Sequence, residues 1–321
     1  MTKDFVYICD DNYCLPTAVS INSLIENLKQ TNSQYNIFVC SFGLSGSNIS
    51  MLESLTTSHV HVVVKIFDPG LYSSKLDSIS QKTHVTPTAL IKFELANLFP
   101  AINSICYLDS DIIIKGDIEE LLATSVNDYY LAACQEFMSY LNDVQYHFRT
   151  RTDFYFNSGV MLLNLGKIRE EKLTEQLWDY KINRAKTKLM DQETLNKVFE
   201  KKVKPLSIKW NFNPVFCYLE YLNAINRNYG CNYQSIKELE KDVKIVHYVG
   251  KFDKPWVYKT ARFKEYWDMY FERFSDSIKL NYEISAIQNR SFSEKLVGKI
   301  KNVGLIGVIS YLFFKLTGSR Y

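Results

Sequence analysis

Short apolar runs alternate with amphipathic segments along the first third of the chain. The segment that opens at Pro16 has apolar residues at helical spacing through Leu28, and residues 90–98 have the same character. The runs between such segments have the length of buried strands: residues 5–9, 35–40, 60–67 and 104–108. Strands that alternate with helices predict a mostly parallel sheet with helices on both faces.

The pattern changes after residue 111. Asp117, with Glu120 three residues later, indicates the start of a helix. Aromatic residues at helical spacing from Phe263 to Phe274 indicate the buried stripe of another helix. Further strands are expected at residues 112–114, 129–133, 160–163 and 243–246. We therefore expect an α/β fold with a single Rossmann-like mixed sheet flanked by helices.

The composition is that of a globular protein, with 321 residues of which 46% are hydrophobic and 23% charged. The net charge of +3 is too small to indicate a nucleic-acid partner. Charge is spread unevenly, because residues 286–321 hold several lysines and arginines but a single acidic residue, Glu294. We expect one catalytic-size domain over residues 1–285 and a separate basic, apolar tail over residues 286–321.

Seven cysteines, an odd number without a C-x-x-C pair, are typical of a reduced protein, so we expect a cytoplasmic location. Strand-like sequence begins at Phe5, which leaves no room for a signal peptide. The longest apolar stretch, residues 303–314, is too short to span a bilayer. Basic residues flank it, so we expect the tail to lie on the inner membrane surface; packing on the main domain or an oligomer contact are the alternatives.

The strongest chemical signal is the triplet Asp109-Ser110-Asp111, which directly follows the apolar run at residues 104–108. Two carboxylates at this spacing can converge on one divalent cation at the carboxyl end of a strand, where open α/β sheets bind ligands. Oxygen ligands suit Mg²⁺ or Mn²⁺, which complete their shells with phosphates and water. A turn with helix-cap chemistry would produce the same triplet.

Three further segments carry polar residues beside predicted elements. Residues 10–13 follow the first strand and either bind a nucleoside, with Tyr13 stacked on the base, or form a polar turn. Residues 156–159 lead into a buried strand, where Gly159 permits the close approach of a ligand; a plain turn is the alternative. Residues 191–192 open a helix, either as its cap or as a pair that holds sugar hydroxyls.

Residues 247–256 follow another predicted strand and combine a histidine, a glycine and a Lys-Pro-Trp sequence. A histidine at the end of a strand is commonly structural, but His247 can also give a nitrogen ligand to the cation of Asp109 and Asp111. Mixed nitrogen and oxygen ligands slightly favour Mn²⁺ over Mg²⁺. Gly250 would admit a diphosphate near the backbone, and Lys254 would neutralise its charge.

Together these segments resemble glycosyltransferase family 8, which includes bacterial lipooligosaccharide α-galactosyl- and α-glucosyltransferases and, more distantly, glycogenin. The matching motifs occur in the order of the family, and the resemblance runs from residue 5 to about residue 260. The resemblance implies a GT-A fold, a UDP-sugar donor, Mn²⁺ and retention of the anomeric configuration. By the same resemblance, Asp109, Asp111 and His247 would hold the metal, while Gly250 and Lys254 would hold the diphosphate.

The resemblance also implies a nucleotide subsite. Asp10, Asn12 and Tyr13 would hold the uridine, with Ile8 and Ser110 among the contacts of the nucleotide. Asp109 would lie near the ribose as well as the metal.

The donor sugar would be held by Asn157, Asp191 and Gln192.

Two positions depart from the family. An arginine usually stands where this chain has Lys92, which keeps the charge but loses the bidentate fork. The family also has two residues between the glycine and the Lys-Pro-Trp sequence, whereas this chain has three, so either Lys254 still reaches the diphosphate or Lys251 replaces it.

The implied reaction moves a hexose, galactose or glucose, to a saccharide of lipopolysaccharide, capsule or another surface glycan. Metal and lysine would stabilise the departing diphosphate. Retention needs either two displacements, with Gln192 as the candidate nucleophile by position and Asp191 beside it, or attack from the leaving-group face. We favour attack from that face because a neutral amide is a poor nucleophile. Acceptor contacts are expected near residues 137–151 and 210–213.

Two other functions fit parts of the same pattern. Paired carboxylates with a metal also serve nucleotidyltransferases, although residues 10–16 lack the glycines of a phosphate loop. A protein that binds a sugar nucleotide without catalysis is the second alternative. The intact set of Asp109, Asp111, His247 and Lys254 argues against it.

Overall fold

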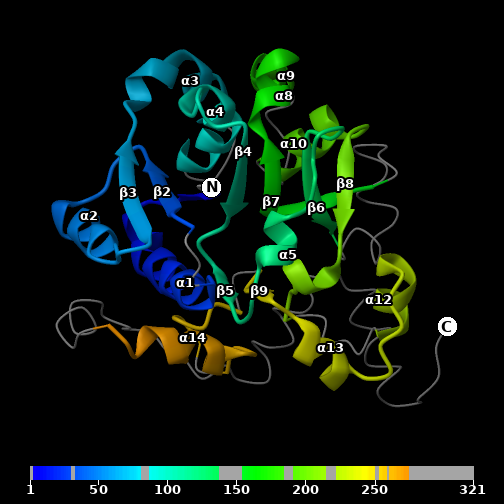
Figure 1. Ribbon diagram of the computed structural model, residues 1–321. Coiled ribbons are helices and arrows are strands. Elements are labelled where there is room, and N and C mark those ends of the chain that lie inside the picture. Colours follow the sequence, from blue (N-terminus) through cyan, green and yellow to red (C-terminus); the bar gives the residue numbers. More distant parts are fainter. Residues whose placement is uncertain are drawn as a thin grey trace, which may run out of the picture.

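A seven-stranded sheet forms the centre of the molecule, with the strand order β3-β2-β1-β4-β7-β6-β8 (Figure 1). The computed structural model describes residues 3–29, 33–80, 87–136, 154–183, 191–214, 222–249, 253–258 and 260–274. The strands of the large sheet are β1 Lys3–Ile8, β2 Tyr35–Ser41, β3 Val60–Ile66, β4 Ser104–Leu108, β6 Leu131–Gln135, β7 Phe156–Asn164 and β8 Val203–Leu206.

The directions of the strands divide this sheet into two parts. β3, β2, β1 and β4 run parallel, as their alternation with helices predicts. β7 runs antiparallel to both of its neighbours, β4 and β6, whereas β6 and β8 are parallel to each other. The predicted mixed α/β sheet is therefore confirmed. The antiparallel strand brings its amino end to the edge at which β4 and β6 end.

A second, two-stranded sheet lies beside the large one and was not expected as a separate unit. β5 (Ile112–Ile114) pairs antiparallel with β9 (Ile245–His247), and Ile112 stands opposite His247. Figure 1 shows this small sheet beside α13 and α14, far from α3 and α9. The pairing joins a segment just after β4 to one near residue 247, and it positions the candidate site.

Helices cover both faces of the large sheet, and the alternation of side chains along β1 shows why. Phe5 and Tyr7 pack into one apolar cluster, while Val6 and Ile8 pack into the other. The first cluster includes residues of α1 Cys14–Asn27, α2 Gly46–Glu53, α5 Glu119–Leu122, α12 Leu222–Tyr229, α13 Ile236–Asp242 and α14 Lys264–Phe271. The second includes residues of α3 Ser73–Ser80, α4 Ile91–Leu98, α8 Leu165–Glu170, α9 Leu173–Asn183 and α10 Gln192–Phe199.

Some predicted boundaries need correction. α1 begins at Cys14, so Pro16 lies inside its first turn. The predicted Asp117–Glu120 pair does not form a capping box; the Asp117 carboxylate accepts the backbone N–H of Glu119 at 2.8 Å. Residues 156–159 do not precede a strand as a turn, because β7 begins at Phe156 and includes them.

Candidate active site

The predicted polar residues gather at one edge of the large sheet. Asp10 follows β1 and Asp109 follows β4, and these two strands are parallel neighbours. β7 starts at the same edge, since Leu108 pairs with Val160. Ligands of open α/β sheets bind at the carboxyl ends of parallel strands, so the topology places these residues where a substrate is expected.

Asp109, Asp111 and His247 form a compact group whose ligand atoms all lie within 4.8 Å of one another. His247 Nε2 lies 3.2 Å from Asp111 Oδ1 and 3.7 Å from Asp109 Oδ2. The pairing of β5 with β9 accounts for this proximity, because Asp111 immediately precedes β5 and His247 ends β9. The predicted grouping of these three residues is therefore present in the fold.

This donor set fits Mn²⁺ or Mg²⁺. Two carboxylates and one imidazole nitrogen offer hard and borderline ligands, and both ions accept such a shell with open positions for phosphate or water. Gly159 makes room for the group, because a Cβ atom at residue 159 would stand 2.2 Å from His247 Cε1 and 2.9 Å from Asp109 Oδ2. The space beside Gly159 is thus occupied by the side chains of His247 and Asp109, and the close approach of a bound ligand there stays a prediction.

Lys254 stands directly beside this group. Its ammonium pairs with Asp111 and donates to the Tyr248 carbonyl oxygen at 2.7 Å. Burial would by itself raise the pKa of Asp111, but the ammonium of Lys254 holds that pKa well below its usual value. Burial would likewise lower the pKa of Lys254, but Asp111 raises it. Both groups therefore remain charged at neutral pH, next to the place where a diphosphate is expected.

Lys92, on α4, forms a second charged group on the other side of Asp109. Its ammonium pairs with Asp191 and lies 3.6 Å from Asp109 Oδ1. Burial would lower the pKa of Lys92, but the two carboxylates raise it. Tyr107 donates its hydroxyl to the same Asp109 oxygen at 2.5 Å. A lysine at this position thus contacts two carboxylates at once, although it lacks the fork of an arginine.

Asp191 and Gln192 stand at the start of α10, as predicted, but Asp191 does not cap the helix with its side chain. Its carboxylate pairs with Lys92 and accepts the Ser158 hydroxyl at 3.3 Å. Burial would raise the pKa of Asp191, but Lys92 and the backbone N–H groups at 191 and 192 lower it. Gln192 accepts the Ser158 backbone N–H at 3.0 Å and donates to Glu136 at 3.3 Å.

Glu136 is a site residue that the sequence analysis missed. It directly follows β6, is 9% exposed, and accepts the Asn157 side-chain amide at 2.7 Å. The signal that identified Asp109, a carboxylate just past a buried strand, also applies to Glu136. Asn211 was expected among acceptor contacts; it is buried instead, 2.8 Å from His247 Nδ1 and from Asn157 Oδ1.

The loop after β1 lies at the same edge and forms the 3₁₀ turn η1 (Asp11–Tyr13). Asp10 Oδ1 accepts the backbone N–H groups of Asn12 and Tyr13, so one carboxylate oxygen fixes the turn. Tyr13 is 38% exposed and meets Trp256 edge-on with ring centroids 6.0 Å apart. The polar turn is therefore present, and it leaves an aromatic ring open to solvent beside the site.

Ile8 and Ser110 join this loop to the Asp-x-Asp segment. Ser110 donates its hydroxyl to the Ile8 carbonyl oxygen at 3.1 Å and lies 2.8 Å from the Thr17 hydroxyl. Ser110 is buried, so its hydroxyl serves the packing of β1 against β4. The nucleotide roles of Ile8, Ser110, Asp10 and Asn12 remain predictions.

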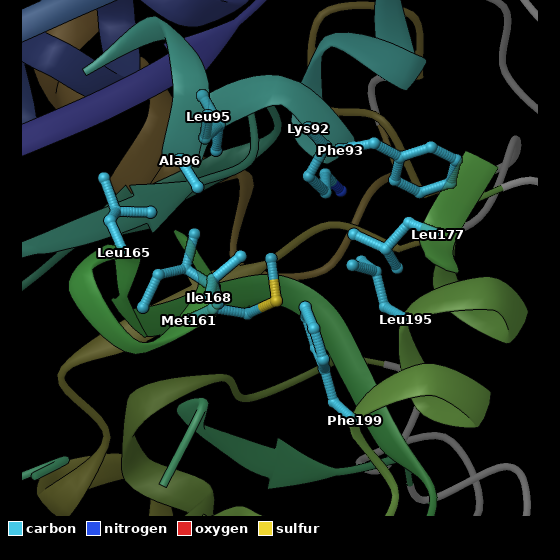
Figure 2. A pocket seen from close by; sticks show the side chains of 11 residues that line it. Lys92, Phe93, Leu95, Ala96, Met161, Leu165, Ile168, Leu177, Leu195 and Phe199 are labelled. Carbon is cyan, nitrogen blue, oxygen red and sulfur yellow. The ribbon is translucent and has the colours of Figure 1, made fainter. Parts of the chain in front are cut away.

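A small apolar cavity lies behind the site, between β7 and the helices α4, α8, α9 and α10 (Figure 2). Its volume of about 10 Å³ leaves room for at most one water molecule. Lys92 alone is charged among the lining residues, so its methylene stem faces apolar side chains while its ammonium reaches the two carboxylates. The cavity is part of the support for Lys92 and is too small to bind a substrate.

Several predicted features lie outside the described residues: Gly250, Lys251, residues 137–151 and the tail at residues 286–321. Which lysine meets the diphosphate, and how the tail is used, therefore stay predictions. Over the described part of the chain, every helix is too short or too polar to cross a bilayer.

An α/β sheet whose carboxyl edge carries an Asp-Asp-His group and buried lysines is typical of enzymes that act on phosphate-bearing substrates. The family model described as "Glycosyl transferase family 8" matches residues 4–260. Because this match covers most of the chain, the protein belongs to glycosyl transferase family 8. The predicted family is confirmed, and a nucleotidyltransferase is not supported.

The chain is also similar to curated relatives, one of which has a glucosyltransferase name. The chain is 29% identical over 255 residues to lipopolysaccharide 1,2-glucosyltransferase of Escherichia coli, covering 77% of this chain and 71% of the relative. It is 26% identical over 292 residues to general stress protein A of Bacillus subtilis, covering 86% of this chain and 95% of the relative.

Solved structures confirm the predicted GT-A fold. The galactosyltransferase LgtC, in complex with donor and acceptor sugar analogs, has a TM-score of 0.66 at 20% identity, with 85% of this chain and 96% of that chain covered. Mouse xyloside xylosyltransferase 1 has a TM-score of 0.57 at 16% identity, with 79% of this chain and 99% of that chain covered.

Proposed function

We propose that this family 8 enzyme moves a hexose, galactose or glucose, from a UDP-sugar to a surface-glycan acceptor, with retention of configuration and dependence on a divalent metal. The observation that carries the proposal is the Asp109–Asp111–His247 group with Lys254 beside it. The names of the relatives, a lipopolysaccharide glucosyltransferase and a galactosyltransferase, support hexose transfer.

Asp109, Asp111 and His247 would hold the metal, Mn²⁺ or Mg²⁺. A bound cation would supply positive charge to the diphosphate that leaves during the reaction. Lys254 adds a second positive charge at the same place, since its raised pKa keeps it protonated. Because Lys254 is held by Asp111 and by a backbone carbonyl, its charge is oriented before substrate arrives, which is the arrangement that stabilises a transition state best.

The donor would lie along the edge of the sheet. Tyr13 offers an exposed ring for the uracil base, and Asp10 and Asn12 would hydrogen-bond the uridine. The hexose would lie toward β7 and α10, beside Asn157 and Gln192, whose side-chain amides are oriented by hydrogen bonds to the protein. Lys92, which is held between Asp109 and Asp191, would also contact the sugar.

We favour attack on C1 from the leaving-group face. Gln192 is neutral and is hydrogen-bonded at both ends of its amide, so its oxygen is a poor nucleophile. The charge of Asp191 is neutralised by Lys92. The acceptor hydroxyl would therefore attack as the diphosphate departs, and a phosphate oxygen would take the hydroxyl proton. The basic tail at residues 286–321 would hold the enzyme on the membrane surface, where the acceptor would lie.

The test is release of UDP by the purified protein from a panel of UDP-sugars, in Mn²⁺ and in EDTA. Asp111→Asn is the variant, and the thermal midpoint of each protein reports that it is folded. Slow hydrolysis of one UDP-hexose that is lost in EDTA and in Asp111→Asn supports the proposal and identifies the donor.

Two other outcomes are informative. Metal-dependent UDP binding without hydrolysis means that an acceptor is required, and membrane glycolipids are then supplied. A protein that neither turns over any UDP-sugar nor binds UDP with metal contradicts the proposal and leaves a non-catalytic role.

A further inference from the structure

A chain of side-chain hydrogen bonds runs from Glu136 to the candidate metal ligand His247. Asn157 Nδ2 donates to Glu136 Oε2 at 2.7 Å, and Asn211 Nδ2 donates to Asn157 Oδ1 at 2.8 Å. Asn211 Oδ1 then lies 2.8 Å from His247 Nδ1. Asn157 is 8% exposed and Asn211 is 5% exposed. Because both side chains are buried, water competes little for these hydrogen bonds, which are stronger than they would be at the surface.

The orientation of every amide in this chain follows from one backbone group. The Gly159 N–H can only donate, and it lies 2.9 Å from the Asn157 side chain, so the atom that it meets must be the Asn157 oxygen. The Asn157 amide nitrogen therefore faces Glu136, whose carboxylate can only accept. The group of Asn211 that faces the Asn157 oxygen must be its nitrogen, which leaves its oxygen for His247.

The ring of His247 is fixed by the same logic. Since Asn211 presents an acceptor, Nδ1 of His247 must carry the proton and donate it. When the ring is neutral, as it must be to bind a cation, Nε2 is unprotonated, and this is the atom 3.2 Å from Asp111 and 3.7 Å from Asp109. A lone pair thus points at the place where the two carboxylates converge.

The backbone holds Asn211 in position for this contact. The N–H of Phe212 donates to the Ile245 carbonyl at 3.0 Å, and the N–H of His247 donates to the Phe212 carbonyl at 2.9 Å. The segment after η4 (Ile208–Trp210) is therefore attached to β9 on both sides of Val246, the residue before His247. Asn211 cannot move away from the ring unless these bonds break.

We propose that Asn211 is a positioning residue that, with Asn157 and Glu136 behind it, holds His247 as the Nδ1–H tautomer with Nε2 ready to bind a divalent cation. The inference rests on the proposed metal dependence of the enzyme. Partners of a metal-ligating histidine fix its ring and its tautomer, and their loss commonly weakens metal affinity about 10- to 100-fold.

The experiment compares Mn²⁺ affinity, measured by calorimetry on the full chain without donor, in three variants. Asn211→Leu keeps the approximate size of the side chain but removes the acceptor. Asn211→Asp keeps an oxygen for His247 Nδ1. Asn164→Leu is the matched control, because Asn164 ends β7, the strand of Asn157, and its side chain also makes two hydrogen bonds, to Val126 and Lys167.

We expect Asn211→Leu to bind Mn²⁺ about 10- to 100-fold more weakly than wild type. Asn211→Asp should recover most of that loss, and Asn164→Leu should bind Mn²⁺ as wild type does. Wild-type affinity in Asn211→Leu, or equal losses in Asn211→Leu and Asn164→Leu, overturns the proposal.

A second measurement does not depend on metal. Long-range ¹H–¹⁵N spectra of the metal-free wild-type protein report the tautomer of each neutral histidine, and His247→Gln identifies the signals of His247. The Nδ1–H form is expected, and the Nε2–H form overturns the proposal. If wild type binds no Mn²⁺, the metal part of the proposed function fails, while the tautomer still decides whether Asn211 orients the ring.

Discussion

Gly159 of β7 and His247 of β9 lie so close together that a Cβ atom at residue 159 would stand 2.2 Å from His247 Cε1. The backbone of Gly159 does not have the positive φ that usually requires glycine. The constraint is space: two elements about 90 positions apart in the chain meet at this point, and the ring occupies the volume that any side chain would need.

Gly159→Ala should therefore displace the His247 ring and weaken Mn²⁺ binding at least about tenfold, as expected for the loss of a ligand's support. The overpacking should also destabilise the protein by about 1–3 kcal/mol. Calorimetry with Mn²⁺ and urea unfolding measure the two effects. Gly46→Ala is the control, because a Cβ there meets nothing within 4 Å; unchanged Mn²⁺ binding in Gly159→Ala would contradict the steric account.

Lys254→Gln should lower kcat with the best UDP-sugar about 100- to 1,000-fold, the usual cost of removing one donor that faces a developing oxyanion. The KM for the donor should change less, because the charge matters most in the transition state. Steady-state kinetics measure both constants. Lys264→Gln removes a lysine of α14 that also pairs with an aspartate, Asp268, away from the site, and it should retain wild-type kcat.

Tyr13→Ala should weaken UDP binding by about 1–3 kcal/mol, roughly 5- to 150-fold, which is the range for stacking of a base on an aromatic ring. Tyr13→Phe keeps the ring and should bind UDP nearly as wild type does. Calorimetry with UDP and Mn²⁺ gives both affinities. Equal losses in the two variants would show that the hydroxyl, and not the ring, is what binds.

The Lys92–Asp191 pair predicts a pH dependence of stability. Because the pKa of Asp191 is lower in the folded protein than in the unfolded chain, its contribution is fully present above about pH 3.9 and is lost as pH falls through the folded pKa. Asp191→Asn should therefore flatten the decline in the free energy of unfolding below about pH 4. Urea unfolding between pH 7 and pH 3 measures the free energy of unfolding of each protein, and Asp128→Asn, at an exposed position, is the control. Parallel curves for wild type and Asp191→Asn would contradict the predicted contribution of Asp191.

Most elements were predictable because their patterns are local. The strands at residues 35–40, 60–67 and 104–108 match β2, β3 and β4 within a residue or two. The error at residues 156–159 has a physical reason. Asn, Ser and Gly are poor strand formers, and β7 includes them because they are buried between β4 and β6 and because Gly159 must leave room for His247.

The residues of the candidate site were likewise predictable from the sequence only in part. Asp109, Asp111 and His247 were identified because each follows or ends an apolar run, and such positions lie at a sheet edge. Glu136 satisfies the same rule but follows a weaker strand signal. The role of Asn211 carried no signal, since its contact with His247 depends on how η4 is attached to β9.

The sequence by itself determined the α/β class, the positions of most elements and the residues able to bind a metal, because periodicity and residue chemistry act over a few neighbours. The tertiary structure alone decided the antiparallel insertion of β7, the separate β5–β9 sheet and the order of hydrogen bonds from Glu136 to His247. Those features depend on pairings between segments distant in the chain, where backbone hydrogen bonding and exclusion of volume, rather than local preference, select the partner.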